Sequence, residues 1–574
     1  MPMKRLKVVA DFETTTDPED VRVWAACAVD IESLETVHIS NSIDAFFDWL
    51  KDKNTVCYFH NLKFDGEFLL SYILTHGYKY SDKKKSKTFN TLITDTGIFY
   101  SIEVIFEKKD KEYKKVTFYD SLKKLPFKVA TISKAFNLPD EKLEIDYKAF
   151  RPVGHELTEE ERRYIVNDCR IVAAALKIQF EQGLKKMTNA SDAMSGYKKI
   201  FGAKQFAKVF PVFPIELDSF IRKAYKGGYV YLNPKHKNAR GLQGVAFDVN
   251  SLYPSVMHDC VLPYGYPIYF EGEPEPDEHY NLFIVHIKCR FYLKKDHLPT
   301  IQIKNNRSYV ETEYLTTSKV NMGAYDVDEA VDLVLTNVDL QLLLDHYDVE
   351  DLVYVKGFKF KGRAGFFTEY IDYWMHIKET TTGAIRQLAK LMLNSLYGRF
   401  ALNPKSDTKI PTIDEDQIVR HKYVTVETAK DLGVDEPELR DPVYTAMGAF
   451  ITAYAREKTI RSGQRVYHRF IYADTDSLKL VGYDVPEDLD VHPTKLGAWK
   501  NEGCFVDSKW IRAKTYMTTD EDGTVKVTCA GMPDNVKAKV TYDNFQSGST
   551  FDGKLMPKRC KGGVVLVETT LTIK

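Results

Sequence analysis

The sequence predicts a multidomain protein that combines α/β and α+β architecture. At 574 residues the chain is too long for one hydrophobic core, and ordinary domain sizes suggest roughly three to five domains. Near the amino terminus, an apolar strand signal at Val56–Phe59 runs through a polar turn into the helix-like segment EFLLSYI. Farther along, Phe470–Leu480 has the pattern of two apolar strands joined by a tight turn. We therefore expect an α/β region followed by an α+β region.

Composition is that of a soluble globular protein, with 44% hydrophobic and 28% charged residues. The formal net charge is -1, so any phosphate-binding surface has to be a local channel. The 8 cysteines show neither CxxC nor zinc-type Cys/His spacing, which indicates reduced thiols in a cytosol-like compartment. The chain enters a strand pattern almost at once and has no run of ~18 apolar residues. We expect a soluble intracellular protein without signal or transmembrane segment.

Four acidic residues in the first third of the chain form one candidate site. Asp11 and Glu13 stand two apart near the end of an apolar strand, so both leave on the same face. Asp65 comes directly before Gly66 and the helix-like segment. Each could be structural on its own, but with Asp168 they make a cluster of the type that holds two divalent ions roughly 4 Å apart for phosphodiester hydrolysis.

The helix that carries Asp168 has a clear start signal. Thr158 with Glu161 three residues later is a capping box. Tyr164 and Asp168, four residues apart, should then share one face of the helix.

A second candidate site combines Asp248 with the DTD turn of Phe470–Leu480. Asp474 and Asp476 lie at the tip of that turn, where an Asx-rich turn facing water is the alternative. Asp248 ends the short apolar strand Val245–Phe247. Carboxylates from two core strands, with an open side, suit two hard cations whose shells are completed by phosphate oxygens.

A strongly helical run, from Phe366 to Tyr397 with a break near Thr380–Gly383, supplies cationic residues. Arg386, Lys390, Asn394 and Tyr397 fall on one polar face of it, for which a solvated surface is the alternative, and Gly398 is expected as its C-cap. Upstream, the pair of glycines in AYKGGYV lets the backbone approach another group closely, or forms a plain hairpin turn.

These motifs resemble those of known enzymes. DVNSLYPS, KLMLNSLYG and YADTDS resemble motifs A, B and C of the family B DNA polymerases, whereas DFE, HNLKFDG and YIVND resemble the motifs of DEDDy 3′–5′ exonucleases. Their order and spacing, over essentially the whole chain, resemble the protein-primed branch of the bacteriophage phi-29 type. The resemblance implies an RNase H-like exonuclease domain plus a right-hand polymerase domain (palm, fingers, thumb) with two insertions.

The resemblance also implies roles for individual residues at the polymerase site. Asp248 and Asp476 would bind both catalytic ions, with the Val249 carbonyl as a further ligand and Asp474 in support. Tyr253 would pack under the sugar and reject a 2′ hydroxyl. The implied nucleotide pocket consists of Tyr253, Lys378, Arg386, Lys390, Asn394 and Tyr397. The cofactor would be Mg²⁺, two ions per active site, with Mn²⁺ as a substitute.

At the exonuclease site, the resemblance makes Asp11, Glu13, Asp65 and Asp168 metal ligands. Tyr164 would orient the attacking water, and Lys142 would contact the scissile phosphate. The primer end would be held by Thr14, His60, Asn61, Phe64, Ser121 and Leu122. Template contacts fall on Tyr225, Lys226, Gly227 and Gly228, and primer contacts near the polymerase site on Thr452, Arg456, Lys514 and Tyr516.

The same resemblance divides the chain into seven regions. They are the exonuclease domain (1–188), a first palm segment (189–260), an insertion that docks the terminal protein and DNA (261–363), the fingers (364–400), an insertion for strand displacement and processivity (401–440), a second palm segment (441–528) and the thumb (529–574).

The predicted function is replication of a phage-like linear genome by a protein-primed, processive, strand-displacing polymerase with proofreading. Expected partners are primer-template DNA, dNTPs and a terminal protein, with a monomer acting in the cytoplasm of the infected bacterial host. Two alternatives are weaker. A DNA-binding initiation protein with vestigial sites predicts missing carboxylates, and none is missing; a nuclease with an accessory domain leaves Asp248, Lys390, Asn394 and Asp476 unexplained.

Overall fold

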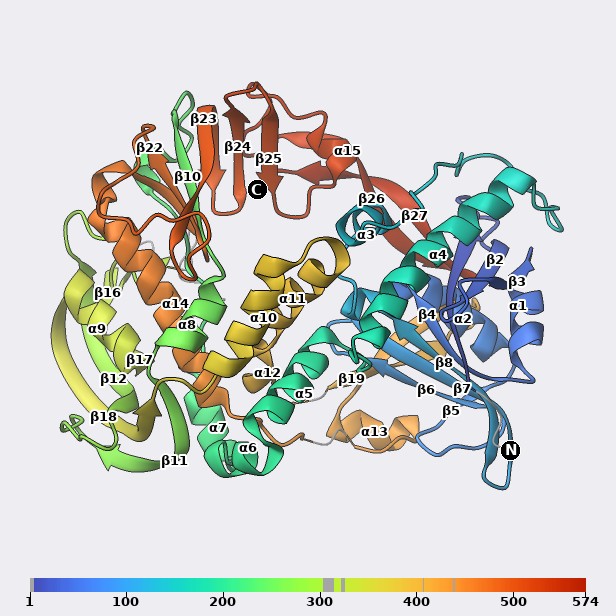
Figure 1. Cartoon of the computed structure of the whole chain (residues 1–574), viewed down its shortest axis with the longest axis horizontal. Coiled ribbons are helices and arrows are strands. Elements are labelled where there is room, and N and C mark those ends of the chain that lie inside the picture. Colours follow the sequence, from blue (N-terminus) through green and yellow to red (C-terminus); the bar gives the residue numbers. More distant parts are fainter. Residues whose placement is uncertain (1–4, 303–313, 322–325, 406, 437–438) are drawn as a thin grey trace.

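Two large β-sheets organise the chain, and each carries one of the acidic clusters (Figure 1). The computed structural model describes residues 5–302, 314–321, 326–405, 407–436 and 439–574. None of the helices in these ranges combines the length and apolar character that a membrane crossing requires.

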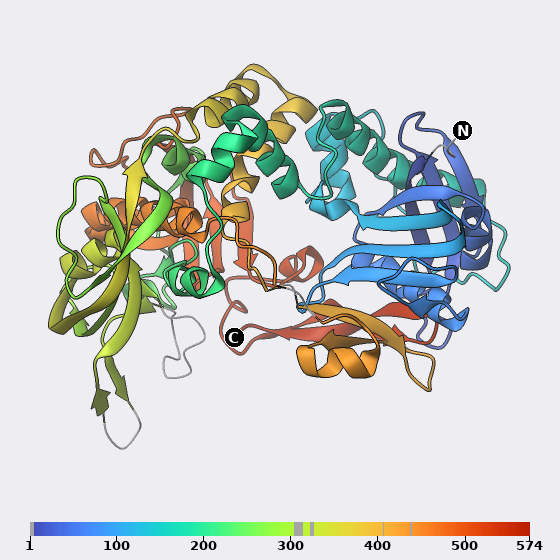
Figure 2. The ribbon, with the colours of Figure 1, turned by 90° about the horizontal axis from the view of Figure 1, so that it is seen from below.

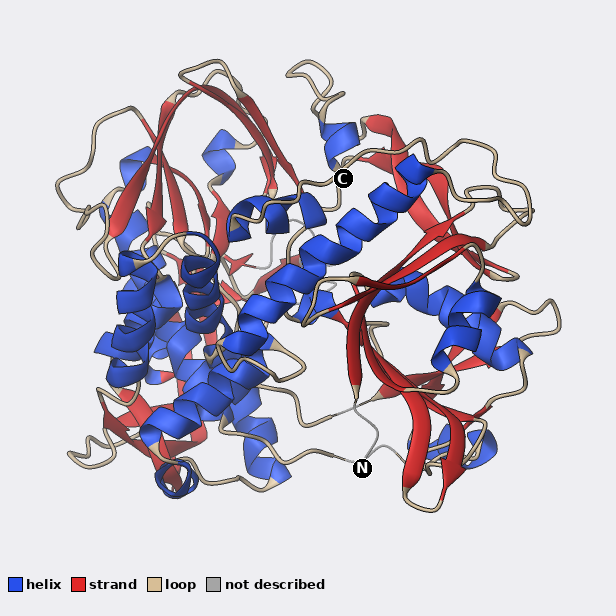
Figure 3. Cartoon of the chain, turned by 45° about the vertical axis from the view of Figure 1, so that its right-hand side comes forward, coloured by secondary structure: helices blue, strands red, loops and turns tan. Residues whose placement is uncertain are grey.

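The amino-terminal sheet has eight strands in the order β3-β2-β1-β4-β8-β7-β6-β5, with β1, β4 and β8 parallel at its centre. Alternate residues of β1 face opposite cores, since Val9 packs with helix α4 whereas Val8 and Ala10 pack with α1 and α2. The elements are β1 (Leu6–Thr14), β2 (Val23–Asp30), β3 (Thr36–Ser40), α1 (Ile43–Leu50), β4 (Asn54–Phe59), α2 (Leu62–Thr75), β5 (Lys79–Tyr80), β6 (Thr88–Ile93), β7 (Phe99–Lys109), β8 (Glu112–Asp120), α3 (Val129–Phe136) and α4 (Glu159–Glu181). The long α4 lies along this sheet in Figure 3.

The central sheet has seven strands in the order β25-β24-β23-β10-β22-β21-β9. Its elements are β9 (Val230–Leu232), β10 (Gly244–Val249), β21 (Phe470–Asp474), β22 (Ser477–Val481), β23 (Trp499–Arg512), β24 (Thr515–Asp520) and β25 (Val525–Cys529). Helices α8 (Leu252–Asp259) and α14 (Thr445–Arg465) share its core. The predicted hairpin at Phe470–Leu480 is confirmed as β21 and β22, with Thr475 at a left-handed φ of 58° in the turn.

Within 261–363, the described residues form a separate four-stranded sheet in the order β11-β18-β12-β17. It consists of β11 (Leu262–Glu271), β12 (Leu282–Leu293), β17 (Val331–Thr336) and β18 (Tyr347–Arg363), with helix α9 (Asn337–His346) packed on it. Short strand pairs lie beside it: β13 (Ile301–Gln302) with β14 (Tyr314–Leu315), and β15 (Lys319–Asn321) with β16 (Asp326–Asp328).

Helices join the two large sheets. They are α5 (Asn189–Phe201), α6 (Ala203–Val209), α7 (Ile215–Arg222), α10 (Thr368–Thr380), α11 (Gly383–Ser395) and α12 (Tyr397–Phe400). The predicted break near Thr380–Gly383 is confirmed, because α10 ends at Thr380 and α11 begins at Gly383. The C-cap prediction for Gly398 is wrong, since the helix is interrupted at Leu396 and Gly398 lies inside α12.

Two small pieces from the second half of the chain return to the amino-terminal sheet (Figure 2). The first is the hairpin β19 (Thr408–Ile413) and β20 (Val419–Val424), followed by α13 (Val426–Leu432). The second is the hairpin β26 (Thr550–Cys560) and β27 (Gly563–Thr572), which follows α15 (Asp534–Lys537). Both hairpins place a valine, Val419 and Val564, in the core beside α2.

Candidate active sites

Strand pairing brings Asp248 to the DTD turn. In β10 the side chains of Val245, Phe247 and Val249 are buried, so Asp248 leaves on the opposite, open face. Asp248 is paired with Ser477 across the β10–β22 ladder, and the Val249 amide donates to the Asp476 carbonyl at 2.7 Å. The carboxylates predicted to act together therefore come from neighbouring strands at one edge of the site.

This proximity is unfavourable for two negative charges. Burial, followed by the nearby Asp476 and Glu502 carboxylates, raises the pKa of Asp248 to about 7, although Lys479 and Lys500 oppose the shift. Burial and Asp474 also raise the pKa of Asp476. Like charges in a half-buried place favour protonation or a bound cation.

Carboxylates and lysines line one cavity of about 190 Å³. Its lining consists of Asp248, Val249, Ser251, Leu252, Tyr253, Lys378, Lys390, Leu393, Asn394 and Asp476. Burial lowers the pKa of Lys378, and the positive charges of Lys390 and Arg386 lower it further. The Lys378 ammonium donates to the Ser251 hydroxyl at 2.9 Å. A cavity lined by both carboxylates and lysines suits a ligand that carries phosphates together with divalent ions.

Two tyrosines form one wall of the same region. The rings of Tyr253 and Tyr397 are stacked, with centroids 4.1 Å apart and planes 19° from parallel. Arg386 is not in this lining; its guanidinium donates to the Lys378 carbonyl at 3.0 Å and is otherwise exposed. Tyr397 is also outside the lining, but its ring stacks on Tyr253, which does line the cavity.

Asp474 has polar partners of its own. It accepts a hydrogen bond from the Tyr472 hydroxyl at 3.1 Å and forms an ion pair with Lys514 at 3.1 Å. Tyr516 packs beside them, with its ring stacked on Trp510 at 4.7 Å. The predicted residues Lys514 and Tyr516 are thus held next to the DTD turn.

The glycine pair of AYKGGYV touches that turn from the other side. A Cβ at Gly228 would lie 2.5 Å from the Thr475 hydroxyl oxygen, so only glycine fits there. The Thr475 amide donates to the Tyr229 carbonyl at 2.6 Å. Tyr225 and Lys226 instead line a cavity of about 770 Å³ toward the 261–363 sheet.

The predicted primer contacts on α14 are buried. Arg456 is 2% exposed and pairs with Asp339 of α9 at 2.8 Å, and its other nitrogen donates to the Gly227 carbonyl at 2.9 Å. Thr452, also 2% exposed, donates to the Gly448 carbonyl at 3.0 Å. Arg456 thus braces the glycine loop, whereas Thr452 bonds within its own helix, and a DNA contact by either stays a prediction.

The amino-terminal acids converge from three elements. Asp11 and Glu13 come from β1, Asp65 from α2 and Asp168 from α4. Burial, then Asp168, raises the pKa of Asp11 to about 7, and burial together with Asp11 raises the pKa values of Glu13 and Asp65 well above their ordinary range. Asp65 was predicted to precede the helix, but α2 begins at Leu62, which places Asp65 in its first turn, where the helix dipole favours a carboxylate.

Lys142 is the cation at this cluster. Its ammonium binds the Asp168 carboxylate and donates to the Tyr164 hydroxyl at 3.1 Å, consistent with the predicted shared face of Tyr164 and Asp168. The other Asp168 oxygen, Oδ1, is buried without a hydrogen-bond partner in the structure. Such an orphaned oxygen beside several like charges fits a divalent cation.

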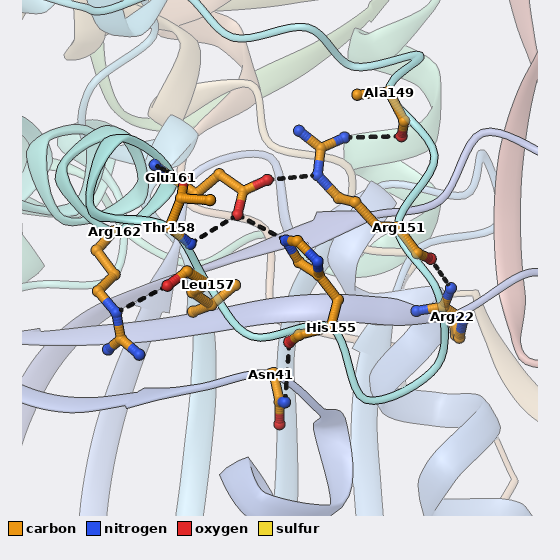
Figure 4. Close-up of polar contacts among 9 residues, drawn as sticks. All are labelled: Arg22, Asn41, Ala149, Arg151, His155, Leu157, Thr158, Glu161 and Arg162. Atoms are coloured by element: carbon orange, nitrogen blue, oxygen red, sulfur yellow. Dashed lines mark hydrogen bonds and ion pairs between the residues drawn. The ribbon is translucent and has the colours of Figure 1, made fainter.

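The loop that carries Lys142 is pinned to the start of α4 (Figure 4). The predicted capping box of Thr158 and Glu161 is confirmed. Glu161 also accepts from Arg151 and His155, each at 2.7 Å. Burial raises the pKa of the Glu161 carboxyl, but the hydrogen bonds from Thr158, Arg151 and His155 outweigh it and lower that pKa to about 2.

The predicted primer-end residues gather where β1, β4 and β8 end. The two ring nitrogens of His60 contact the Ser121 hydroxyl and the Phe127 carbonyl, each at 2.8 Å. The amides of Asn61 and Leu122 donate to Asp120. Phe64 packs near Phe68, with ring centroids 5.8 Å apart, and Thr14 is the last residue of β1.

Neither cluster closes a metal shell by itself. In the stretches of the chain that the structure describes, no three His, Cys, Asp or Glu side chains are already gathered as a set that could hold an ion. Mg²⁺ keeps several waters and is often bound by one or two carboxylates plus substrate phosphates. The residues therefore fit ions whose remaining ligands come from water and a phosphate.

Some residues of these sites were missed from the sequence. The Tyr147 hydroxyl contacts that of Tyr164, and Glu502, Lys479 and Lys500 surround Asp248. Tyr147 lies only five residues after Lys142, but no motif includes it and so the sequence did not single it out. Asp339, the partner of Arg456, is 117 residues away and has no local signal.

Comparison with known proteins gives one consistent result. The sequence profile of DNA polymerase type B, organellar and viral, matches residues 48–156 and 144–492. The chain is 46% identical to the DNA polymerase of Bacillus phage M2 and 44% identical to that of Bacillus phage phi29, over 100% of each chain. It is 35% identical to the DNA polymerase of Streptococcus phage Cp-1 over 98% of each.

Solved structures agree with the sequence relatives. The chain is similar to phi29 DNA polymerase complexed with primer-template DNA and incoming nucleotide substrates, with a TM-score of 0.92, 44% identity and 100% coverage of both chains. The same TM-score relates it to phi29 DNA polymerase complexed with single-stranded DNA.

The charge crowding at Asp248 predicts a pH-dependent stability difference. An unfolded Asp loses its proton near pH 4, whereas folded Asp248 keeps it up to about pH 7, so stability falls as pH rises through that window and stays lower above it. Without divalent ions, Asp248→Asn should raise the melting temperature at pH 8 by on the order of 2 °C, as measured by differential scanning fluorimetry. The gain should vanish at pH 4.

Asp474→Asn is the matched control, because its carboxylate has Lys514 as a counter-ion and should gain nothing. A lower melting temperature for Asp248→Asn at pH 8 would contradict the crowding.

Proposed function

The chain belongs to the DNA polymerases of type B, organellar and viral, and we propose that it is a protein-primed, processive and strand-displacing replicative enzyme with 3′–5′ proofreading. The predicted family and fold are confirmed by the full-length match to phi29-type polymerases. The polymerase assignment is extended to individual residues by one observation: Asp248, Asp476, Lys378 and Lys390 line the same cavity.

At the polymerase site, Asp248 and Asp476 would hold two Mg²⁺ ions, for which Mn²⁺ could substitute. The Val249 carbonyl would be a further ligand, and Asp474 would support the site. Bound there, the ions would lower the pKa of the primer 3′ hydroxyl and stabilise the charge that develops on the phosphate. Lys378 and Lys390 would bind the triphosphate as point charges, since each has an ammonium in or beside the cavity. Asn394 lines the same cavity from α11.

Arg386 would contribute by its position. Its bond to the Lys378 carbonyl ties the start of α11 to the end of α10, and its charge lies close enough to shift the pKa of Lys378. It therefore adds positive potential where a triphosphate enters.

At the exonuclease site, Asp11, Glu13, Asp65 and Asp168 would be the ligands of two ions. Lys142 would exchange its contact with Asp168 for the scissile phosphate, and Tyr164 would orient the attacking water. Tyr147, hydrogen-bonded to Tyr164, would help to place that hydroxyl. His60, Asn61, Phe64, Ser121, Leu122 and Thr14 would hold the frayed primer end, with Phe64 offering an apolar contact that tolerates any base.

DNA and nucleotides are proposed as partners because the phi29 enzyme, of the same fold, is described in complex with both. We propose in addition a terminal protein bound by residues 261–363, action as a monomer, and replication in the cytoplasm of an infected bacterium. The full-length similarity to phage polymerases supports these points.

Residues 401–440 and the hairpin β26–β27, here called the thumb hairpin, would close a ring around the DNA. A closed ring slows dissociation, and a narrow template passage admits one strand, so translocation would peel the other strand away. Primer extension with a labelled primer and dNTPs tests the whole assignment: lengthening supports it, whereas shortening alone indicates a nuclease, and neither indicates an initiation protein.

The two active sites should be separable, because the ligands of one come from β1, α2 and α4 and those of the other from β10 and the β21–β22 turn. Asp476→Ala should abolish extension and leave degradation of single-stranded primer within about threefold, since no exonuclease ligand is touched. Asp11→Ala with Asp65→Ala should abolish degradation and retain extension. If either variant lost both activities with an unchanged circular dichroism spectrum, the two-site assignment would fail.

Tyr253 should set sugar selectivity. Tyr253→Val removes the ring that stacks on Tyr397 and opens space beside the sugar. The ratio of ribonucleotide to deoxyribonucleotide incorporation, compared as kcat/KM, should rise about tenfold or more, because a steric clash of this kind amounts to a few kcal/mol. Tyr253→Phe, which keeps the ring, is the control and should retain the original ratio. An unchanged ratio in Tyr253→Val would mean that Tyr253 only packs.

A further inference from the structure

Glu67 is a buried carboxylate that neither active site uses. It lies on α2 and is 3% exposed. Asp65, two residues earlier, belongs to the acidic cluster, but helix positions two apart do not face each other, so Glu67 points elsewhere. A buried charge needs partners of its own.

Both partners of Glu67 come from distant regions of the chain. His421 of β20, 354 residues away, approaches the carboxylate with Nε2 at 3.1 Å. Arg559 of β26, 492 residues away, donates from Nε to the same oxygen, Oε1, at 2.8 Å. One carboxylate therefore joins the amino-terminal domain, the second insertion and the thumb hairpin.

Apolar packing surrounds this junction and fixes its geometry. The His421 ring lies against Phe99, with centroids 5.5 Å apart. The tip of the thumb hairpin fits closely, since a Cβ at Gly562 would lie 2.3 Å from the Val21 carbonyl oxygen and one at Gly563 would lie 2.4 Å from the Phe68 ring. Both hairpins are thus seated on α2 and its neighbours.

The junction completes a closed circuit of the chain (Figure 2). From the central sheet the chain runs through β25 and α15 into the hairpin β26–β27, which meets α2. From α2 the junction leads to β20, and the chain continues through α13 to α14, which packs back on the central sheet. In this circuit the step across α2 is noncovalent.

We propose that Glu67 is a positioning residue that locks this circuit closed, so that the enzyme stays on its DNA through successive additions. The inference rests on the proposed function, in which DNA passes through the ring. Removing the charge of Glu67 leaves Arg559 Nε and His421 Nε2 with a neutral partner, and hydrogen bonds to a neutral acceptor are weaker than those to a carboxylate. The two hairpins would then separate from α2 more often, and DNA would be released at each opening.

The test is Glu67→Gln, which keeps the shape of the side chain and removes its charge. On a primed single-stranded circle with excess trap DNA, product length per binding event should fall by about tenfold, as expected when a charge-assisted hydrogen bond is replaced by a neutral one. The kcat and KM for addition of one nucleotide should stay within about twofold, since no group of the 190 Å³ cavity changes. A merely structural defect would not separate these two readouts.

Asp414→Asn is the matched control. It breaks the pair of the half-buried Asp414 with the exposed Arg420, 2.7 Å apart, which lies within the β19–β20 hairpin and joins no other part of the chain. Its product length should equal that of the unmodified enzyme.

Arg559→Gln breaks the same junction from the other side, as a second variant in case Glu67→Gln fails to fold. The Arg559 side chain is 39% exposed, so its replacement should disturb folding little. It should shorten the products as Glu67→Gln does, the double variant should be no worse than the single ones, and Arg559→Lys should restore much of the length. Removal of residues 407–434 gives the length expected of an open ring. Short products from the unmodified enzyme would overturn both processive replication and the lock. Long products from Glu67→Gln, with short ones from the deletion, would overturn the lock alone.

Discussion

Asp248 and Asp476 are close because strand pairing leaves them no alternative. The register of β10 and β22 places Asp248 opposite Ser477. The hydrogen bond from the Val249 amide to the Asp476 carbonyl then fixes Asp476, the residue before Ser477. The pleat buries Val245, Phe247 and Val249 on the other face, so hydrophobic packing holds the carboxylates in place against their mutual repulsion. The sheet, the glycine loop that touches Thr475 and the helices carrying Lys378 and Lys390 are all arranged around this crowded pair. The free energy of packing thereby holds together carboxylates that a cation would neutralise, and lysines that a phosphate would neutralise.

The amino-terminal cluster applies the same physics with different elements. Its acids come from a strand and two helices, and burial is the main cause of their raised pKa values. One cation, Lys142, is already present and occupies one Asp168 oxygen while the other has no partner. Clusters of carboxylates with raised pKa values can thus be built from unrelated topologies, provided that each buries several carboxylates together.

Local patterns predicted the elements that carry the chemistry. The DTD hairpin, the capping box at Thr158 and the break before Gly383 follow from turn, cap and periodicity rules that act over a few residues. Two predicted helix ends were wrong by one turn or less: α2 begins before Asp65, and Gly398 lies inside α12 instead of capping a helix. Helix ends depend on packing as well as on sequence. The residue roles came from family resemblance, and they stay predictions.

Long-range contacts had no such signal. Asp339 meets Arg456 across 117 residues, and Glu67 meets Arg559 across 492, so nothing near either residue indicates its partner. Arg456 also braces the glycine loop from within the core, and its motif gives no sign of that contact. Such residues become visible only when the sheets and insertions are assembled.

The central claim is that this chain holds two separate cation sites formed by buried carboxylates. Anomalous scattering from crystals grown with Mn²⁺, primer-template DNA and a non-hydrolysable nucleotide tests it most directly. We predict Mn²⁺ peaks at Asp248 and Asp476 and, separately, among Asp11, Glu13, Asp65 and Asp168. The absence of a peak at either cluster, or Mn²⁺ bound only by other residues, would contradict the account.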